Sequence, residues 1–179
     1  MAGLRPLLAR ALDRLPSAAA LAELAGDALG GAVLSNAGRC LPVPGVPSHP
    51  LLTAGSPVVT VAQQHAGTPG TQSSFVTPSA EGLVTICVVE CRDDTADHLT
   101  ALVLVRSAGD LSGLTMLDLG VLGALLHGWD DERISARYGV PDVPARQARI
   151  TGRLGLGSQH ALLLHVAREG LYIPPRLWP

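Results

Sequence analysis

The N-terminal part of the chain changes its pattern of apolar and polar positions several times. Leucines and alanines recur at helical spacing over residues 4–29, which predicts an amphipathic helical segment. The pattern then becomes extended, because GAVLSNAGRCLPV at 31–43 predicts a strand, an Asn-Ala-Gly turn and a second short strand. PVVTVAQQ at 57–64 is a further strand candidate, and the Gly, Pro and Ser content of residues 65–74 predicts a loop after it.

The apolar pattern is most continuous in GLVTICVVEC, residues 82–91, and in HLTALVLVRS, residues 98–107. The acidic segment RDDTAD lies between them, so the two strands pair most simply as an antiparallel hairpin. Nearly every position of both strands is apolar, which indicates that both faces are buried. The first part of the chain is therefore predicted to be a small α+β domain built on an antiparallel sheet.

From Leu114 onward the strand pattern is absent and helical spacing replaces it. We therefore place a domain boundary within residues 107–113 and predict one domain over 1–112 and a second, all-α domain over 113–179. The second domain contains no strand candidate.

The second domain begins with a helix, a tight turn and another helix. Thr115 and Asp118 have the spacing of a capping box, which predicts a helix that starts at Thr115 and ends at Gly128. A shorter helix is predicted from Asp130 to Tyr138, followed by a left-handed glycine.

These elements resemble the C-terminal DNA-binding domain of LuxR-type transcriptional regulators. The positions that carry the resemblance are Leu114-Thr115, Val121-Leu122, Leu125, Gly128, Ile134, Gly139-Val140 and Leu154-Gly155. The tail REGLYIPP, residues 168–175, is similar to the end of actinobacterial members that carry a sensor-like domain in front. The resemblance implies a four-helix helix-turn-helix domain that binds DNA, regulates transcription and forms a homodimer in the cytoplasm.

The stretch that would read DNA departs from the family pattern. Pro141 stands where the family has a capping Ser or Thr, and Asp142 is a substitute cap with Pro144 tolerable in the first turn. A shortened recognition helix is therefore expected from Val143 to Arg153. The predicted DNA contacts are Arg137, Arg146, Gln147, Arg149 and Arg153.

Three of these arginines, at 146, 149 and 153, fall on one helical face, where they suit contact with phosphates or base edges. A solvated charged face on a packing helix is the competing interpretation, and both stay open. The acidic run Asp130-Asp131-Glu132 lies near the first of the two helices that would contact DNA, where it would repel phosphate.

The charge of the chain leaves a second interpretation of its function open. The net charge is −2, and the positive side chains are all arginines, with seven arginines against six acidic residues after residue 113. Strong DNA binding usually needs a more basic domain, because released counterions supply most of the non-specific affinity. The alternative is therefore a regulator-derived protein that has lost DNA binding and binds or transforms a hydrophobic small molecule, for example a biosynthetic enzyme.

The first domain resembles a truncated PAS-like sensor, on strand order alone. Such domains hold a small-molecule ligand between the sheet and its crossover helices. The candidate ligand-pocket residues are His49, Gln63, Thr85 and Cys87. For each of them an ordinary structural role is the competing interpretation.

Other chemistry is not indicated. The three cysteines form no CxxC pair and have no histidine at metal-ligand spacing, which predicts buried free thiols and no metal site. The sequence has no phosphate-binding glycine loop, HExxH or GxSxG motif, so no catalytic residue and no cofactor is predicted. The N-terminal segment lacks the long apolar core of a signal peptide or membrane span, so no membrane partner is expected.

Dimerisation is predicted from HALLLHVA, residues 160–167. Leu162, Leu163 and Val166 form an apolar face there, and in LuxR-type regulators the corresponding helix pairs two subunits. Packing within the chain is the competing explanation for that face.

Overall fold

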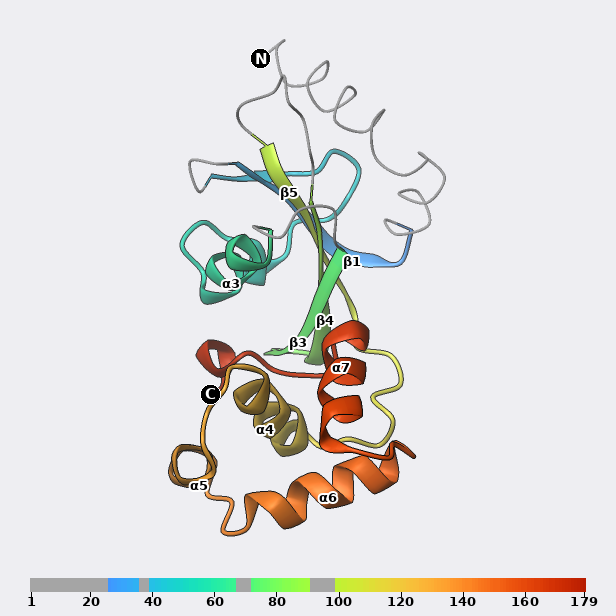
Figure 1. Ribbon diagram of the computed structural model, residues 1–179. Helices are drawn as coiled ribbons and strands as arrows, with labels where there is room; N and C mark the ends of the chain where they lie inside the picture. The colour runs from blue at the N-terminus through green and yellow to red at the C-terminus, as the bar shows by residue number, and fades with distance from the viewer. Residues whose placement is uncertain (1–25, 36–38, 67–71, 91–98) are drawn as a thin grey trace. The chain divides into compact units, whose positions relative to one another are not determined.

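The computed structural model describes residues 26–35, 39–66, 72–90 and 99–179 (Figure 1). Within these ranges the fold is mixed α+β, as predicted, with one five-stranded sheet, helix α3 between its second and third strands, and four helices after its last strand. Several predictions lie outside the described residues: the helical segment as far as residue 25, the turn at 36–38, the acidic turn at 92–97 and Cys91.

The sheet has the strand order β2-β1-β5-β4-β3. Its strands are β1 (Ala28–Ser35), β2 (Cys40–Pro42), β3 (Gln72–Ser79), β4 (Gly82–Glu90) and β5 (Leu99–Ser107). β1 is antiparallel to both of its neighbours, with Val33 opposite Leu41 on β2 and opposite Leu102 on β5. The strand pair predicted over 31–43 and the pairing of the strands over 82–91 and 98–107 are confirmed.

The first strand begins earlier than the sequence indicated. Residues 28 and 29 were included in the predicted helical segment, but they belong to β1. Their Ala and Leu side chains fit either pattern, and pairing of Ala28 with Arg106 on β5 decides the conformation.

The strand predicted at 57–64 is wrong, because these residues form helix α3 (Pro57–His65). The Ser56 side chain accepts a hydrogen bond from the Val59 backbone N–H at 3.1 Å, and Pro57 stands in the first turn, where its missing N–H is tolerated. Val58, Val59, Val61 and Ala62 are buried. Burial of these side chains outweighs the preference of valine for strands.

The loop predicted at 65–74 is wrong at both ends. His65 closes α3, and β3 starts at Gln72. The first residues of β3 are polar and show no apolar strand pattern, whereas the next residues, Phe75, Val76 and Thr77, are buried.

Contacts divide the chain into two compact units. The first comprises residues up to Ser73 together with Ile86–Ser107, and the second comprises Ser74–Thr85 together with Ala108–Pro179. In the first unit, an apolar cluster on β1, β4 and β5 is formed by Val33, Cys87, Val89, Leu102 and Leu104. Burial raises the pKa of the Cys87 thiol, with partial compensation from Arg106, so this cysteine behaves as the predicted buried free thiol.

The second unit consists of the β3–β4 turn region and four α-helices (Figure 1). These are α4 (Met116–Leu126), α5 (Asp131–Tyr138), α6 (Val143–Arg153) and α7 (Gln159–Glu169). α4 contacts each of the other three helices, and the apolar cluster Val121, Ala124, Ile134, Tyr138, Val140 and Val143 joins α4 and α5 to the start of α6. The helices predicted from Thr115, Asp130 and Val143 are confirmed.

The chain after α7 packs against two elements of the second unit. The Ile173 backbone N–H donates to the Leu119 carbonyl of α4 at 3.0 Å, and the Val76 N–H of β3 donates to the Tyr172 carbonyl at 2.8 Å. Burial raises the pKa of Tyr172 to about 12. The short 3₁₀ helix η2 (Pro175–Leu177) follows and contacts α4.

The apolar face predicted for dimerisation is divided in the structure. Leu162 and Val166 are fully buried within the second unit, and Leu163 is half-buried. Leu164, which the prediction did not include, is 60% exposed. The homodimer stays a prediction.

Candidate nucleic-acid interface

Helices α5 and α6 are joined by a short turn whose ends are fixed by specific residues. Gly139 ends α5 in the left-handed conformation, with φ of 67°, and its N–H donates to the Ser135 carbonyl at 2.9 Å. Asp142 then caps α6 by accepting from the Ala145 N–H at 2.8 Å. Asp142 is therefore the cap of α6, as the sequence predicts.

Helix α6 has one anchored face and one open face. Val143 and Ile150 are buried, and they hold the helix on the rest of the unit. The exposed positions are Pro144, Ala145, Ala148, Arg149, Gly152 and Arg153. The open face is thus formed by small side chains with arginines beside them, on a helix that Figure 1 shows at the edge of the second unit.

A buried carboxylate joins α4 to α6. The Asp118 side chain is 3% exposed, and its Oδ2 accepts from the Thr115 N–H at 3.0 Å, as the capping box predicts. The same oxygen also accepts from the Thr115 hydroxyl at 2.7 Å. Its Oδ1 accepts from the Arg146 guanidinium at 2.6 Å and from that of Arg149 at 3.3 Å. One carboxylate therefore caps the first helix of the unit and holds two arginines of α6.

The ionised form of Asp118 is the stable one. Burial by itself would raise the pKa of this carboxyl, but hydrogen bonds from Thr115 and the adjacent Arg146 guanidinium outweigh it, and the pKa is below its usual value. The carboxylate is therefore charged at neutral pH and compensates arginine charge inside the unit.

Two of the remaining predicted DNA contacts, Arg153 and Arg137, have hydrogen-bond partners within the second unit. Arg153 donates to the Gly113 carbonyl, and Arg137 donates to the carbonyls of Trp178 and Pro179 at 3.5 and 3.4 Å. The side-chain nitrogen of Gln147 is buried and, among the described residues, has no hydrogen-bond partner. The sequence placed Arg137 and Arg153 on helices α5 and α6, as the structure does, but it did not predict their hydrogen bonds to these carbonyls.

Asp118 is the residue of this site that sequence reasoning underestimated. The capping-box spacing identified it as a helix cap, but nothing local in the sequence links it to residues 28 and 31 positions later. The signal that could have found it is an acidic residue on an otherwise apolar helix face, where burial needs a cationic partner.

The first turn of α5 is acidic. Asp130 is used as its cap, accepting from the Arg133 N–H at 2.8 Å, and Asp131 and Glu132 are exposed. The Arg133 guanidinium lies over the Trp129 ring at 3.9 Å from the centroid. This end of the helix pair is unsuited to phosphate, so a nucleic acid would meet α6 and not the start of α5.

The candidate ligand-pocket residues fall in two units. His49 precedes the 3₁₀ helix η1 (Pro50–Leu52) and its ring accepts from the Leu51 N–H at 3.2 Å, Gln63 is half-buried on α3, and Cys87 belongs to the sheet cluster. These three belong to the first unit, whereas Thr85 belongs to the second. His49 and Cys87 have the structural surroundings that the competing interpretation expects.

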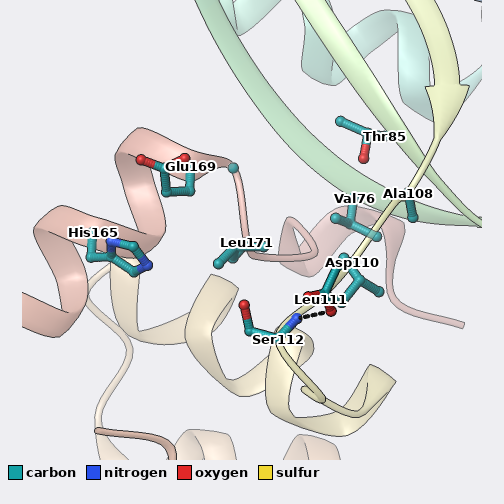
Figure 2. Close-up of a pocket in the computed structure, with 10 residues that line it drawn as sticks. Val76, Thr85, Ala108, Asp110, Leu111, Ser112, His165, Glu169 and Leu171 are labelled. Carbon is teal, nitrogen blue, oxygen red and sulfur yellow. Dashed lines mark hydrogen bonds between the residues drawn. The ribbon is translucent and has the colours of Figure 1, made fainter. Parts of the chain in front are cut away.

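Thr85 lines a shallow pocket of about 250 Å³ within the second unit (Figure 2). Figure 2 shows Asp110 and Ser112 on one side of it and His165 and Glu169 of α7 on the other. The Asp110 carboxylate accepts from the Ser112 N–H at 2.8 Å, so it is engaged in its own turn. Of the four candidate ligand-pocket residues, Thr85 is the one that lines this pocket, whose lining combines apolar and polar side chains.

The described ranges also bear on membranes and metals. Within them, no helix is long and apolar enough to cross a membrane. In the same ranges, no cluster of three or more His, Cys, Asp or Glu side chains could hold a metal ion.

Comparison with known proteins gives low similarity. No protein-family model matches the sequence, and no curated protein matches it. Among solved structures, the Vibrio cholerae VqmA dimer without target DNA, described as a LuxR-type receptor, is 18% identical, with 59% of this chain and 58% of VqmA aligned and a TM-score of 0.33. The VqmA–ligand–DNA complex is 14% identical over 91% of this chain and 93% of VqmA, with a TM-score of 0.34. VqmA bound to DPO is 14% identical over 91% and 95%, with a TM-score of 0.37. Similarity at this level determines neither the fold nor the function of this chain.

Proposed function

We propose that this protein is a DNA-binding transcriptional regulator of the LuxR type, in which α6 of the second unit contacts DNA. The observation that carries the proposal is the arrangement of α5, the turn at Gly139 and α6, in which α6 is anchored on one side and open on the other. An α-helix presented in this way fits the major groove of B-DNA.

The open face of α6 supports close approach to DNA. Ala145, Ala148 and Gly152 present little bulk, so the helix backbone can come near the base edges, and alanine methyl groups can contact thymine methyls. Arg149 is 56% exposed along its side chain and can reach a phosphate or a guanine beside this surface.

The charge distribution predicts modest affinity. Asp118 compensates part of the positive charge on α6, and the chain as a whole has a net charge of −2. Binding should therefore be weaker and supported by fewer phosphate contacts than in a strongly basic domain, and it should decrease steadily as salt increases.

The finer assignments belong to the same proposal. Residues 1–112 are proposed as a PAS-like sensing or dimerising part and residues 113–179 as the DNA-binding part of a cytoplasmic homodimer. His49, Gln63, Thr85 and Cys87 stay candidates for contact with a small-molecule ligand, and Arg137, Gln147 and Arg153 stay candidates for contact with DNA.

The test is binding of the full chain to fluorescein-labelled DNA, measured by anisotropy across a salt series. Two probes serve, a mixed-sequence duplex and the DNA upstream of the protein's own coding region. We expect saturable binding at low salt that weakens linearly on logarithmic axes as salt rises. No detectable binding to either probe at low salt would contradict the proposal and favour the regulator-derived protein that binds a small molecule.

A further inference from the structure

We propose that Asp118 gives two of the arginines of α6 different tasks, so that Arg146 positions the helix and Arg149 contacts a DNA phosphate. The inference rests on the proposed DNA binding and deepens it. In the sequence the two residues are equivalent, three positions apart on one helical face. The structure distinguishes them by distance and by exposure.

Arg146 has the contacts of a structural residue. Its guanidinium lies 2.6 Å from the Asp118 carboxylate, and its side chain is only 20% exposed. Removing a partner from a largely buried ion pair leaves an uncompensated charge, which is costly. Because Asp118 is fixed at the start of α4 by Thr115, this pair helps the apolar anchors of α6 to fix where the helix lies relative to α4.

Arg149 is held more loosely by the same oxygen. Its distance to Asp118 is 3.3 Å, and 56% of the side chain is exposed. A guanidinium has five N–H donors in a planar fork, so one can be held by Asp118 while the others face solvent. The contact with Asp118 restricts the rotamers of Arg149 and lowers the entropy lost when it binds a phosphate.

The test compares Arg146→Ala and Arg149→Ala in the full chain, with Arg168→Ala as the matched control. Arg168 is 86% exposed on α7, so its removal changes the net charge equally without touching this network. Each variant is measured for thermal stability and for affinity to the mixed-sequence duplex across the salt series. Both tryptophans lie in the second unit, so their fluorescence reports on unfolding of that unit.

For Arg149→Ala we expect a roughly tenfold loss of affinity at low salt and a salt slope lower by about one, because one phosphate contact is lost. Its Tm should stay close to that of the wild type. Arg149→Lys should restore the slope, since an ammonium group also neutralises a phosphate.

For Arg146→Ala we expect a Tm lower by roughly 5–15 °C, from the loss of a buried partner. Its affinity should fall while the salt slope stays unchanged. If the alanine variant does not fold, Arg146→Lys replaces it, and there too we expect a lower Tm with an unchanged slope, because the bidentate fork is lost and the charge is kept. Arg168→Ala should alter neither slope nor Tm.

The outcomes separate this inference from the proposed function. Wild-type binding together with a slope reduction of about one in Arg146→Ala, or a Tm loss in Arg149→Ala equal to that of Arg146→Ala, would overturn the division of tasks and leave DNA binding intact. Absence of wild-type binding at low salt would overturn both the proposed function and the task assigned to Arg149.

Discussion

Helices α4 and α6 have the same length, eleven residues each, but they are built in opposite ways. In α4 seven consecutive residues, from Asp118 to Ala124, are buried, so the helix is enclosed on every side at its centre. In α6 only Val143 and Ile150 are buried. One helix is the core of the second unit, and the other is held at a few points with its remaining surface open.

The comparison shows how an open helix can be kept in place. Apolar burial fixes α4, whereas α6 depends on two apolar anchors, the Asp142 cap and the ion pairs with Asp118. A helix that contacts another molecule through its side chains needs few buried positions, because a side chain buried for stability cannot also contact the partner. We expect this difference to appear in the stability of variants at Gly123, Asp118, Asp142 and Gly152, in decreasing order of effect.

The largest effect is expected for Gly123→Ala in α4. A methyl group at this position would overlap the carbonyl of Ile173, a backbone atom that cannot move without displacing the segment after α7. We expect a loss of roughly 3 kcal/mol or more in the free energy of unfolding, as for other overpacked cores. Urea unfolding followed by tryptophan fluorescence measures it, and an unchanged midpoint would show that α4 is less enclosed than described.

The second effect concerns Asp118, where the two helices meet. Its lowered pKa means that its contribution to stability is complete above the unfolded-state value, about 3.9, and is lost as pH falls from there through the lower folded-state pKa. We expect the second unit to lose stability below about pH 4. Asp118→Asn should lower stability at pH 7 by roughly 2 kcal/mol and flatten this acid dependence.

The measurement for Asp118 is tryptophan fluorescence in urea at several pH values. Asp131→Asn is the control, because Asp131 is an exposed carboxylate in the first turn of α5. If Asp118→Asn loses unfolding free energy below pH 4 as steeply as the wild type does, other carboxylates cause the acid lability.

The same contrast explains what the sequence predicts well. The starts of α4, α5 and α6 and the end of α5 agree with the predictions because caps and glycines are local signals: Thr115, Asp130, Gly139 and Asp142 act on atoms within a few residues. These helix boundaries are therefore determined by residues close to them in the sequence. α4 ends at Leu126, two residues before the predicted Gly128.

The errors arise where distant contacts decide the structure. The valines of α3 favour a strand by propensity, and burial of one helical face makes them helical, together with the Ser56 cap and Pro57 at the helix start. β3 was missed because its opening residues are polar while its centre is buried by other segments. Likewise, the sequence located the arginines of α6 but not their contact with Asp118, since that contact joins residues 28 and 31 positions apart.

The third prediction concerns the cap of the open helix. Asp142→Ala removes the acceptor for the Ala145 N–H and should cost about 1 kcal/mol of stability, typical of an N-cap. Because α6 has only two buried anchors, we also expect its first turn to exchange amide hydrogens faster in the variant. Asp130→Ala is the matched change at the cap of α5 and should leave exchange in α6 at its wild-type rate.

The smallest effect is expected for Gly152→Ala, and it has the opposite sign to that of Gly123→Ala. Gly152 lies in α6 with no atom within 4 Å of the position that a methyl group would take, and its φ is not in the left-handed region. Alanine restricts the unfolded chain and favours helix, so stability should rise by roughly 0.5 kcal/mol. Thermal unfolding followed by tryptophan fluorescence measures it, with Gly128→Ala as the control, because Gly128 has a φ of 70° and alanine should be strained there. A loss of stability in Gly152→Ala would mean that this face of α6 is covered, and the contrast between an enclosed α4 and an open α6 would fail.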